Sequence, residues 1–306
     1  MTANTILSDI NEISVGYFLN GKSWSFSNEA KLAYDARVKQ ATPDEVSDAV
    51  GKAEVMASEF LKWAKLNNYS GIVIKNNVWW TARPGELARA SNSDADSKKN
   101  PTDVLVKFTK GPGEAFLGLS AKATKTNGDI GFKNPGIGTV DKSLSLKLQE
   151  FYKKEEAKVI SLYKLPQTSE SRKKHIRANP AIKEETEAIG VKVLASMRDI
   201  LFKKLQSMSQ KELLPYLLQN WMDADVLSPP YIKVTGQGNK APYKAMVMDP
   251  ISNPKLDALR AYPIKMEKVG NESIGVSAGS KKIMKIRFKF ESEKMASSVK
   301  LSGDPW

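Results

Sequence analysis

Asp103 and Lys122 stand on two consecutive apolar segments, and their residue types suit phosphodiester chemistry. Ser120 precedes Lys122 by two positions, so both side chains lie on one face if this segment is a strand. An aspartate offers Mg²⁺ a hard oxygen ligand, and a lysine offers a cation to the attacking water or to charge developing on phosphorus. Each residue also has an ordinary interpretation, Asp103 as a turn residue and Lys122 as a lysine on a solvated strand edge. The occurrence of both residues on consecutive apolar segments favours the interpretation as a phosphodiester-cleaving site.

Composition excludes several other chemistries. The 306 residues contain no Cys and a single His, His175, which removes disulfides, thiolate catalysis, iron–sulfur clusters and multi-His metal sites. With 47 Lys and Arg against 34 Asp and Glu, the formal charge is +13, which points to a polyanionic partner or to a basic surface used only for solubility. The glycine-rich segments at 110–114 and 131–138 lack the Gly-Lys-Ser/Thr ending of a P-loop, so nucleotide hydrolysis is disfavoured.

The periodicity of apolar residues predicts the elements that hold these two side chains. Residues 103–108 alternate as a strand, a Lys-Gly-Pro-Gly turn follows, and residues 115–123 alternate as a second strand. The first 70 residues read as an irregular aromatic opening around 16–21 followed by helices over 28–40 and 42–67, and short strands are expected at 72–75 and 78–82. Further on we expect helices over 141–163, with Asp141 as N-cap, and over 181–205, and a third beginning at Ser209 that Pro215 should kink. Strands then follow at 231–235, 243–248, 264–269, 273–277 and 281–290.

The segments around Asp103 and Lys122 resemble a known family. Asn-Pro-Thr-Asp-Val-Leu-Val-Lys-Phe (100–108), followed by Phe-Leu-Gly-Leu-Ser-Ala-Lys-Ala-Thr (116–124), is similar to the signature of the PD-(D/E)XK nucleases. The Ser-Ala-Lys form and the glycine-rich segment after it are most similar to restriction-endonuclease-like and phage-encoded branches. The resemblance covers roughly 45–165. It implies an α+β fold with a central mixed sheet flanked by helices, in which Asp103 is a ligand of Mg²⁺ or Mn²⁺ and Lys122 is the catalytic lysine.

The sequence departs from the family pattern at Ser120, where the family usually has Glu or Asp. A neutral hydroxyl lowers the charge of the ligand set, and Mg²⁺ binds best with one or two carboxylates. Another acid must then complete the site, or the site is inactive. Glu59, on the helix from which this family often contributes a Glu, is our first candidate, Glu86 is the second, and Glu114 lies too far along its strand.

The same resemblance, together with the composition, gives a division of the chain. We expect an N-terminal extension (1–45), a nuclease-like core (46–165), a helical region (166–228) and a C-terminal β-rich region (229–306) that packs on the core. Double-stranded DNA is the expected partner, and basic residues in three places are expected to contact its backbone: Lys125 and Lys133 in the glycine-rich loop, Arg172, Lys173 and Lys174 in the helical region, and Lys285, Arg287 and Lys289 on the last strand.

Alternatives of other classes remain open at this point. One is a non-catalytic DNA-binding or DNA-end-protecting protein that keeps a degenerate nuclease fold, and another is a structural component whose basic faces meet an acidic protein. No stretch has the roughly 18 apolar residues of a membrane span, and Asp9 and Glu12 do not suit a signal peptide, so we expect a cytoplasmic protein without a membrane partner, in the host cytoplasm if phage-encoded. A homodimer is compatible with the sequence, but no residue identifies its interface.

Overall fold

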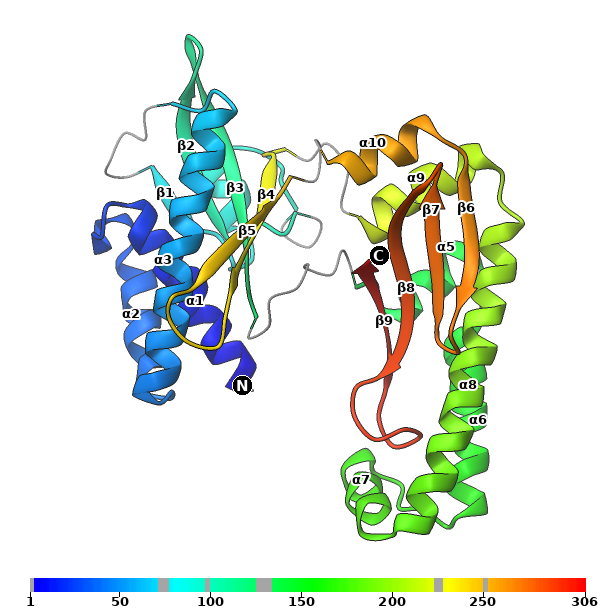
Figure 1. Ribbon diagram of the computed structural model, residues 1–306. Coiled ribbons are helices and arrows are strands. Elements are labelled where there is room, and N and C mark those ends of the chain that lie inside the picture. Colours follow the sequence, from blue (N-terminus) through cyan, green and yellow to red (C-terminus); the bar gives the residue numbers. More distant parts are fainter. Residues whose placement is uncertain (1–2, 71–76, 97–99, 125–133, 223–227, 250–252) are drawn as a thin grey trace. The chain divides into compact units, whose positions relative to one another are not determined.

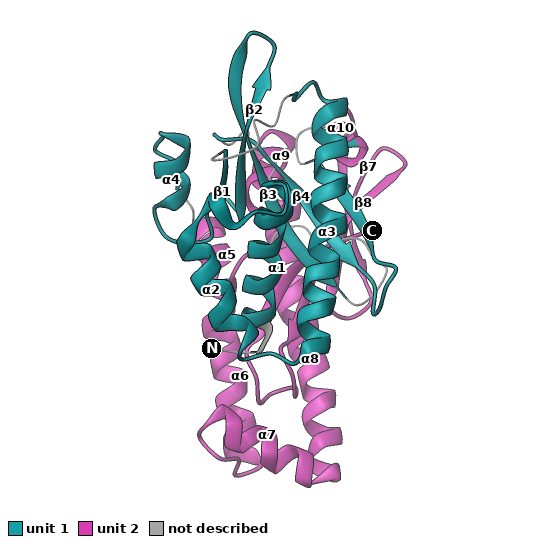
Figure 2. Ribbon diagram, turned by 90° about the vertical axis from the view of Figure 1, so that its left-hand side faces the viewer, with its two compact units in different colours: residues 1–128, 226–253 teal, residues 129–225, 254–306 magenta. Residues whose placement is uncertain are grey.

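The computed structural model describes residues 3–70, 77–96, 100–124, 134–222, 228–249 and 253–306. It confirms the α+β class, with many helices, a mixed five-stranded sheet and an antiparallel four-stranded sheet (Figure 1). The chain forms two compact units, Met1–Gly128 with Val226–Asn253 and Asp129–Asp225 with Pro254–Trp306 (Figure 2). Residues 226–253 thus belong with the N-terminal part of the chain, which differs from the four consecutive parts expected from the sequence.

Unit 1 carries the mixed sheet. Its helices are α1 (Ala3–Leu19), α2 (Asn28–Val38), α3 (Pro43–Leu66) and α4 (Glu86–Ser91), with a short 3-10 turn at Trp24–Phe26. Its strands are β1 (Val78–Trp80), β2 (Val104–Lys110), β3 (Gly113–Thr124), β4 (Tyr231–Gln237) and β5 (Lys244–Met248), which lie side by side in that order. All neighbours are antiparallel except β3 and β4, which are parallel. A parallel pair needs a long crossover connection, and here the chain builds much of unit 2 between the two strands.

The core of unit 1 lies between one face of this sheet and the helices α1 and α3. Ile13 of α1 and Phe60 of α3 belong to one buried cluster with Val106 of β2 and Leu119 of β3. Burying each such side chain stabilises the fold by about 1.5–3 kcal/mol, so this cluster fixes the two helices against the strands. The helix α3 begins as its sequence predicts, because Thr42 and Glu45 form a reciprocal capping box ahead of it.

The helix α1 was not expected, since Gly16 and the aromatic residues after it read as an irregular segment. Within this helix Gly16 lies against the ring of Phe26, where an added Cβ would come within 3.1 Å of that ring. Ile6, Ile10, Ile13 and Tyr17 recur at helical spacing and would have indicated this helix. The expected strand at 72–75 lies outside the described residues.

Unit 2 pairs helices with the antiparallel sheet. The helices are α5 (Ile137–Leu144), α6 (Leu148–Leu162), α7 (Ser169–Ala178), α8 (Pro180–Gln206), α9 (Gln210–Trp221) and α10 (Pro254–Ala261). The strands β6 (Ile264–Val269), β7 (Ser273–Ala278), β8 (Lys281–Phe290) and β9 (Val299–Pro305) form the sheet in that order. The single helix expected over 141–163 is two helices, because Ser145 adopts a left-handed conformation and the Asp141 carboxylate accepts hydrogen bonds from the N–H groups of Leu148 and Gln149. Asp141 therefore caps the second helix from within the first.

Candidate active site

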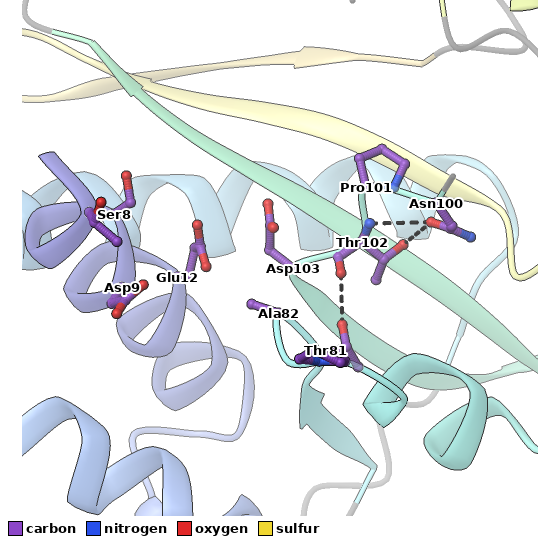
Figure 3. A pocket seen from close by; sticks show the side chains of 11 residues that line it. Ser8, Asp9, Glu12, Thr81, Ala82, Asn100, Pro101, Thr102 and Asp103 are labelled. Atoms are coloured by element: carbon purple, nitrogen blue, oxygen red, sulfur yellow. Dashed lines mark hydrogen bonds between the residues drawn. The ribbon is translucent and has the colours of Figure 1, made fainter. Parts of the chain in front are cut away.

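The backbone around Asp103 is held by a chain of buried hydrogen bonds at the start of β2. The Asn100 side chain donates to the carbonyl of Pro229 at 2.9 Å and accepts from the hydroxyl of Thr102 at 2.7 Å. Thr81, just after β1, donates through its hydroxyl to the Thr102 carbonyl and through its N–H to the Asp103 carbonyl (Figure 3). Asp103 is therefore fixed to both neighbouring strands, since its own N–H donates to Leu119 on β3.

The Asp103 side chain turns toward the Ser-Ala-Lys segment of β3, as the sequence predicted. One carboxylate oxygen, Oδ2, accepts from the backbone N–H of Ala121 at 2.7 Å, from Lys122 Nζ at 3.3 Å and, at 3.5 Å, from the Ser120 hydroxyl. The side chain of Asp103 is 17% exposed and that of Lys122 is 47% exposed, so the pair lies at the border of solvent. Burial raises the pKa of Asp103, and the Lys122 charge and the Ala121 N–H oppose that rise.

The acid that accompanies Asp103 comes from α1. Glu12 lines the same cavity of about 490 Å³ as Asp103, and Figure 3 shows the two carboxyl groups on facing elements. Burial, and then the negative charge of Asp103, raise the pKa of Glu12 to about 8, while Lys122 opposes the shift. Two carboxyl groups that resist ionisation together are a common feature of functional sites. Asp9 also lines this cavity, but its carboxylate is bound by Arg37 at 2.7 Å.

A second cavity of about 400 Å³ adjoins the first and shares Ser8 and Glu12 with it. Lys122 lines this cavity together with Lys52 of α3, whose side chain is only 2% exposed. The Lys52 ammonium donates to Asp48 at 2.7 Å and lies 5.7 Å from the centre of the Tyr243 ring. Two lysines and the Glu12 carboxyl thus line one hollow beside the strand end.

The two acids that we expected to join Asp103 lie elsewhere in unit 1. Glu59 forms an ion pair with Lys62 at 2.5 Å on α3, and Glu86 pairs with Arg89 at 2.7 Å on α4, which lowers the Glu86 pKa. Neither lines the cavities that contain Glu12. Glu114 pairs with Lys107. Glu12 was not among the expected site residues because α1 itself was not predicted, and only the isoleucine spacing noted above could have placed it on a helix.

The residues expected to contact DNA are spread over both units. Lys125 and Lys133 lie outside the described residues. Arg172 does not fit the expected role, because it is buried and its guanidinium donates to the Glu156 carboxylate at 2.8 Å and to backbone carbonyls. Lys174 pairs with Glu170 on the exposed side of α7, next to the partly exposed Lys173. Lys285, Arg287 and Lys289 lie on one face of β8, as alternation predicted.

The donor set beside Asp103 fits a magnesium or manganese ion. Within the described ranges no three His, Cys, Asp or Glu side chains cluster as a metal site. Magnesium, however, needs only one or two carboxylates, since waters and phosphate oxygens complete its shell. Glu12 and Asp103 supply two carboxylates, both hard oxygen donors, whereas the fully buried Ser120 lines neither cavity.

Comparison with family models, with curated proteins and with solved structures found no match. Among the described residues, no helix has both the length and the apolar character to cross a membrane.

Proposed function

We propose that the chain is a metal-dependent nuclease of the PD-(D/E)XK type that hydrolyses phosphodiester bonds in DNA. The observation that supports this most directly is the convergence of Glu12, Asp103 and Lys122 from one helix and two adjacent strands. The resemblance implies the same set: an acid from a helix, an Asp that opens one core strand and a Lys on the next. With Glu12 in place, the second carboxylate comes from α1, so the neutral Ser120 does not leave the site one acid short.

Glu12 and Asp103 would hold the ion, with Mg²⁺ preferred for their hard oxygen donors. A bound Mg²⁺ supplies charge for the phosphoryl oxygens and lowers the pKa of water. Asp103 is positioned for this role by the backbone N–H of Ala121, which binds Oδ2 in a fixed direction. The carboxyl of Glu12 faces the Asp103 carboxyl from α1, a helix that packs into the core. Both acids are therefore carried by backbone that the core holds in place.

Lys122 is placed to provide electrostatic stabilisation in this reaction. Its ammonium reaches Asp103 at 3.3 Å yet remains half-exposed, so it can contact both the protein acid and a phosphate that enters from solvent. There it would orient the attacking water and stabilise negative charge as it develops on the phosphate. The net charge of +13 favours the approach of a nucleic acid.

A second candidate function follows from Ser120, whose hydroxyl replaces the usual acid and is fully buried. If the fold has lost its chemistry at that position, the protein would bind DNA or protect DNA ends without cutting. Binding that is insensitive to EDTA, without any nicking, would select this alternative.

The test is incubation of the full chain with supercoiled plasmid DNA and Mg²⁺. Asp103→Ala and Lys122→Ala should each reduce cleavage by at least a hundredfold, while binding measured in EDTA remains within a few-fold of wild type. Glu59→Gln is the matched control, because that partly exposed acid is paired with Lys62 and lines neither cavity. Cleavage that survives either active-site change would remove that residue from the mechanism.

A further inference from the structure

The long helix α8 packs on one face of the four-stranded sheet of unit 2. Ile274, Val276, Ile286 and Phe288 point to the face on which the long helix α8 packs, and Figure 1 shows α5 and α8 behind these strands. Strand register assigns the residues of the opposite face, which we call the basic face. It carries six cationic side chains and two acidic ones: Lys265, Lys282, Lys285, Arg287, Lys289 and Lys300, with Glu267 and Asp304.

Ion pairs account for only part of this positive charge. Arg287 is paired with Glu272 at 2.7 Å, and Lys300 is paired with Glu291. Within the part of the chain that the structure describes, Lys282, Lys285 and Lys289 form no ion pair. In addition, Lys289 stands directly opposite Lys300 on the neighbouring strand, and Glu291 pairs with Lys300 alone of the two.

An indole ring lies among these lysines. Trp306 packs over Gly275 of β7, where an added Cβ would come within 2.5 Å of the ring, so only glycine lets the ring lie against the strand. Lys282 and Lys285 of β8 lie 4.3 Å and 6.0 Å from the ring centre. Both ammonium groups lie over the ring, so cation–π contacts hold the indole against the strand.

We propose that the basic face binds single-stranded nucleic acid, with its phosphates along the lysines of β8 and a base against Trp306. The cations of β8 that form no ion pair favour a polyanionic ligand, and the aromatic ring among them favours one whose bases are unpaired and can stack. Sheets that bind single strands combine basic residues with an aromatic side chain on the open face, because stacking tolerates any base. This site is separate from the proposed cleavage site and does not depend on it.

The test measures binding of a labelled oligothymidylate to the full chain by fluorescence anisotropy, in EDTA so that no cleavage intervenes. The triple variant Lys282→Gln, Lys285→Gln, Lys289→Gln should weaken binding at least tenfold and reduce the slope of log K against log salt by about 2. Trp306→Leu should weaken it about tenfold. The control variant Lys192→Gln, Lys203→Gln, Lys211→Gln removes the same charge from exposed positions on α8 and α9 and should change affinity less than threefold.

Equal weakening by both triple variants would overturn the proposal, since bulk charge would then explain the binding. A duplex of the same length that competes as well as the oligothymidylate would overturn the assignment to single strands. Lysine acetylation of the wild-type protein, read by mass spectrometry, avoids any question of variant folding: the oligonucleotide should protect Lys282, Lys285 and Lys289 and leave Lys192 and Lys203 reactive. Loss of cleavage in Asp103→Ala, with this binding intact, would separate the two proposals.

Discussion

Burial and then the negative charge of Asp103 raise the pKa of Glu12, although the two residues lie far apart in the sequence. Each is held by the core, Asp103 through the strand backbone and Glu12 through a helix that packs on the sheet. Burial and the Asp103 charge make ionisation of Glu12 unfavourable, and a bound cation would relieve that cost. This relationship gives the first two predictions.

Replacement of Glu12 by Gln should abolish Mg²⁺-dependent cleavage and also remove the response of the protein to the ion. We expect millimolar Mg²⁺ to raise the melting temperature of the wild-type chain, because an ion that binds only the folded state stabilises it. The Glu12→Gln and Asp103→Asn variants should show little or no rise, whereas Glu59→Gln should behave as wild type. A full Mg²⁺ response in Glu12→Gln would exclude Glu12 as a ligand.

The stability of the metal-free protein should depend on pH through Glu12. Its pKa is about 8 in the folded chain against 4.5 for the free group, so between these values the folded state binds more protons than the unfolded state. Unfolding free energy from this group therefore falls as pH rises from about 5 to 8, by an amount on the order of a few kcal/mol.

Urea unfolding in EDTA at pH 6, 7 and 8 measures that effect when wild type is compared with Glu12→Gln. Gln cannot ionise, so the variant should gain stability relative to wild type with each step upward in pH. The comparison cancels the acids with lowered pKa values, such as Glu212 and Glu291, whose contributions are lost at acid pH. A difference that does not change with pH would show that Glu12 ionises normally.

Asp48 and Lys52 should behave as a coupled pair inside α3. Lys52 is buried, and Asp48 is the carboxylate that its ammonium contacts at 2.7 Å. Asp48→Ala should therefore lower the unfolding free energy by about 2–4 kcal/mol, because it leaves a buried cation without its counter-charge. The double variant Asp48→Ala, Lys52→Met should recover much of that loss. Chemical denaturation of the wild type, the two single variants Asp48→Ala and Lys52→Met, and the double variant gives the coupling energy, and simple additivity would contradict the pairing.

Gly118→Ala should disturb the site without touching any proposed catalytic group. An added Cβ at Gly118 would lie 2.1 Å from the Thr102 hydroxyl, which binds Asn100 beside Asp103. We expect the free energy of unfolding to fall by about 1–3 kcal/mol. We also expect the cleavage rate to fall by more than the decrease in the fraction of folded protein explains. Gly113→Ala, at the open start of the same strand, is the matched control, since nothing lies within 4 Å of its added Cβ. Equal activity of the two variants would show that Thr102 does not position Asp103.

The sequence predicted those parts of the fold that local patterns determine. The strands β2, β3 and β8 and the beginnings of α3 after Thr42 and of α9 after Ser209 were predicted correctly, because each depends on neighbouring residues alone. Pro215, at which we expected a kink, lies inside α9, and the helix does not end there. The pairing of Asp103 with Lys122 also follows from two consecutive strands joined by a short turn.

What could not be predicted depends on contacts between distant segments. Gly16 has the residue type of a helix breaker, and its contact with Phe26 is not visible in the sequence. Because α1 was therefore not predicted, Glu12 was not placed beside Asp103. Arg172 reads as a surface cation until Glu156 and the preceding loop are seen around it. Likewise nothing local indicates that β4 returns to pair with β3.

That return has a consequence for how the protein is made. While the chain emerges from the ribosome, β3 has one edge without a partner until the whole helical segment 134–222 and then β4 have been synthesised. Until then that edge can pair with another nascent chain. Because contacts between residues so far apart also form slowly, we expect unit 1 to reach its final structure only late in synthesis, and chaperones that shield exposed strands to raise its yield.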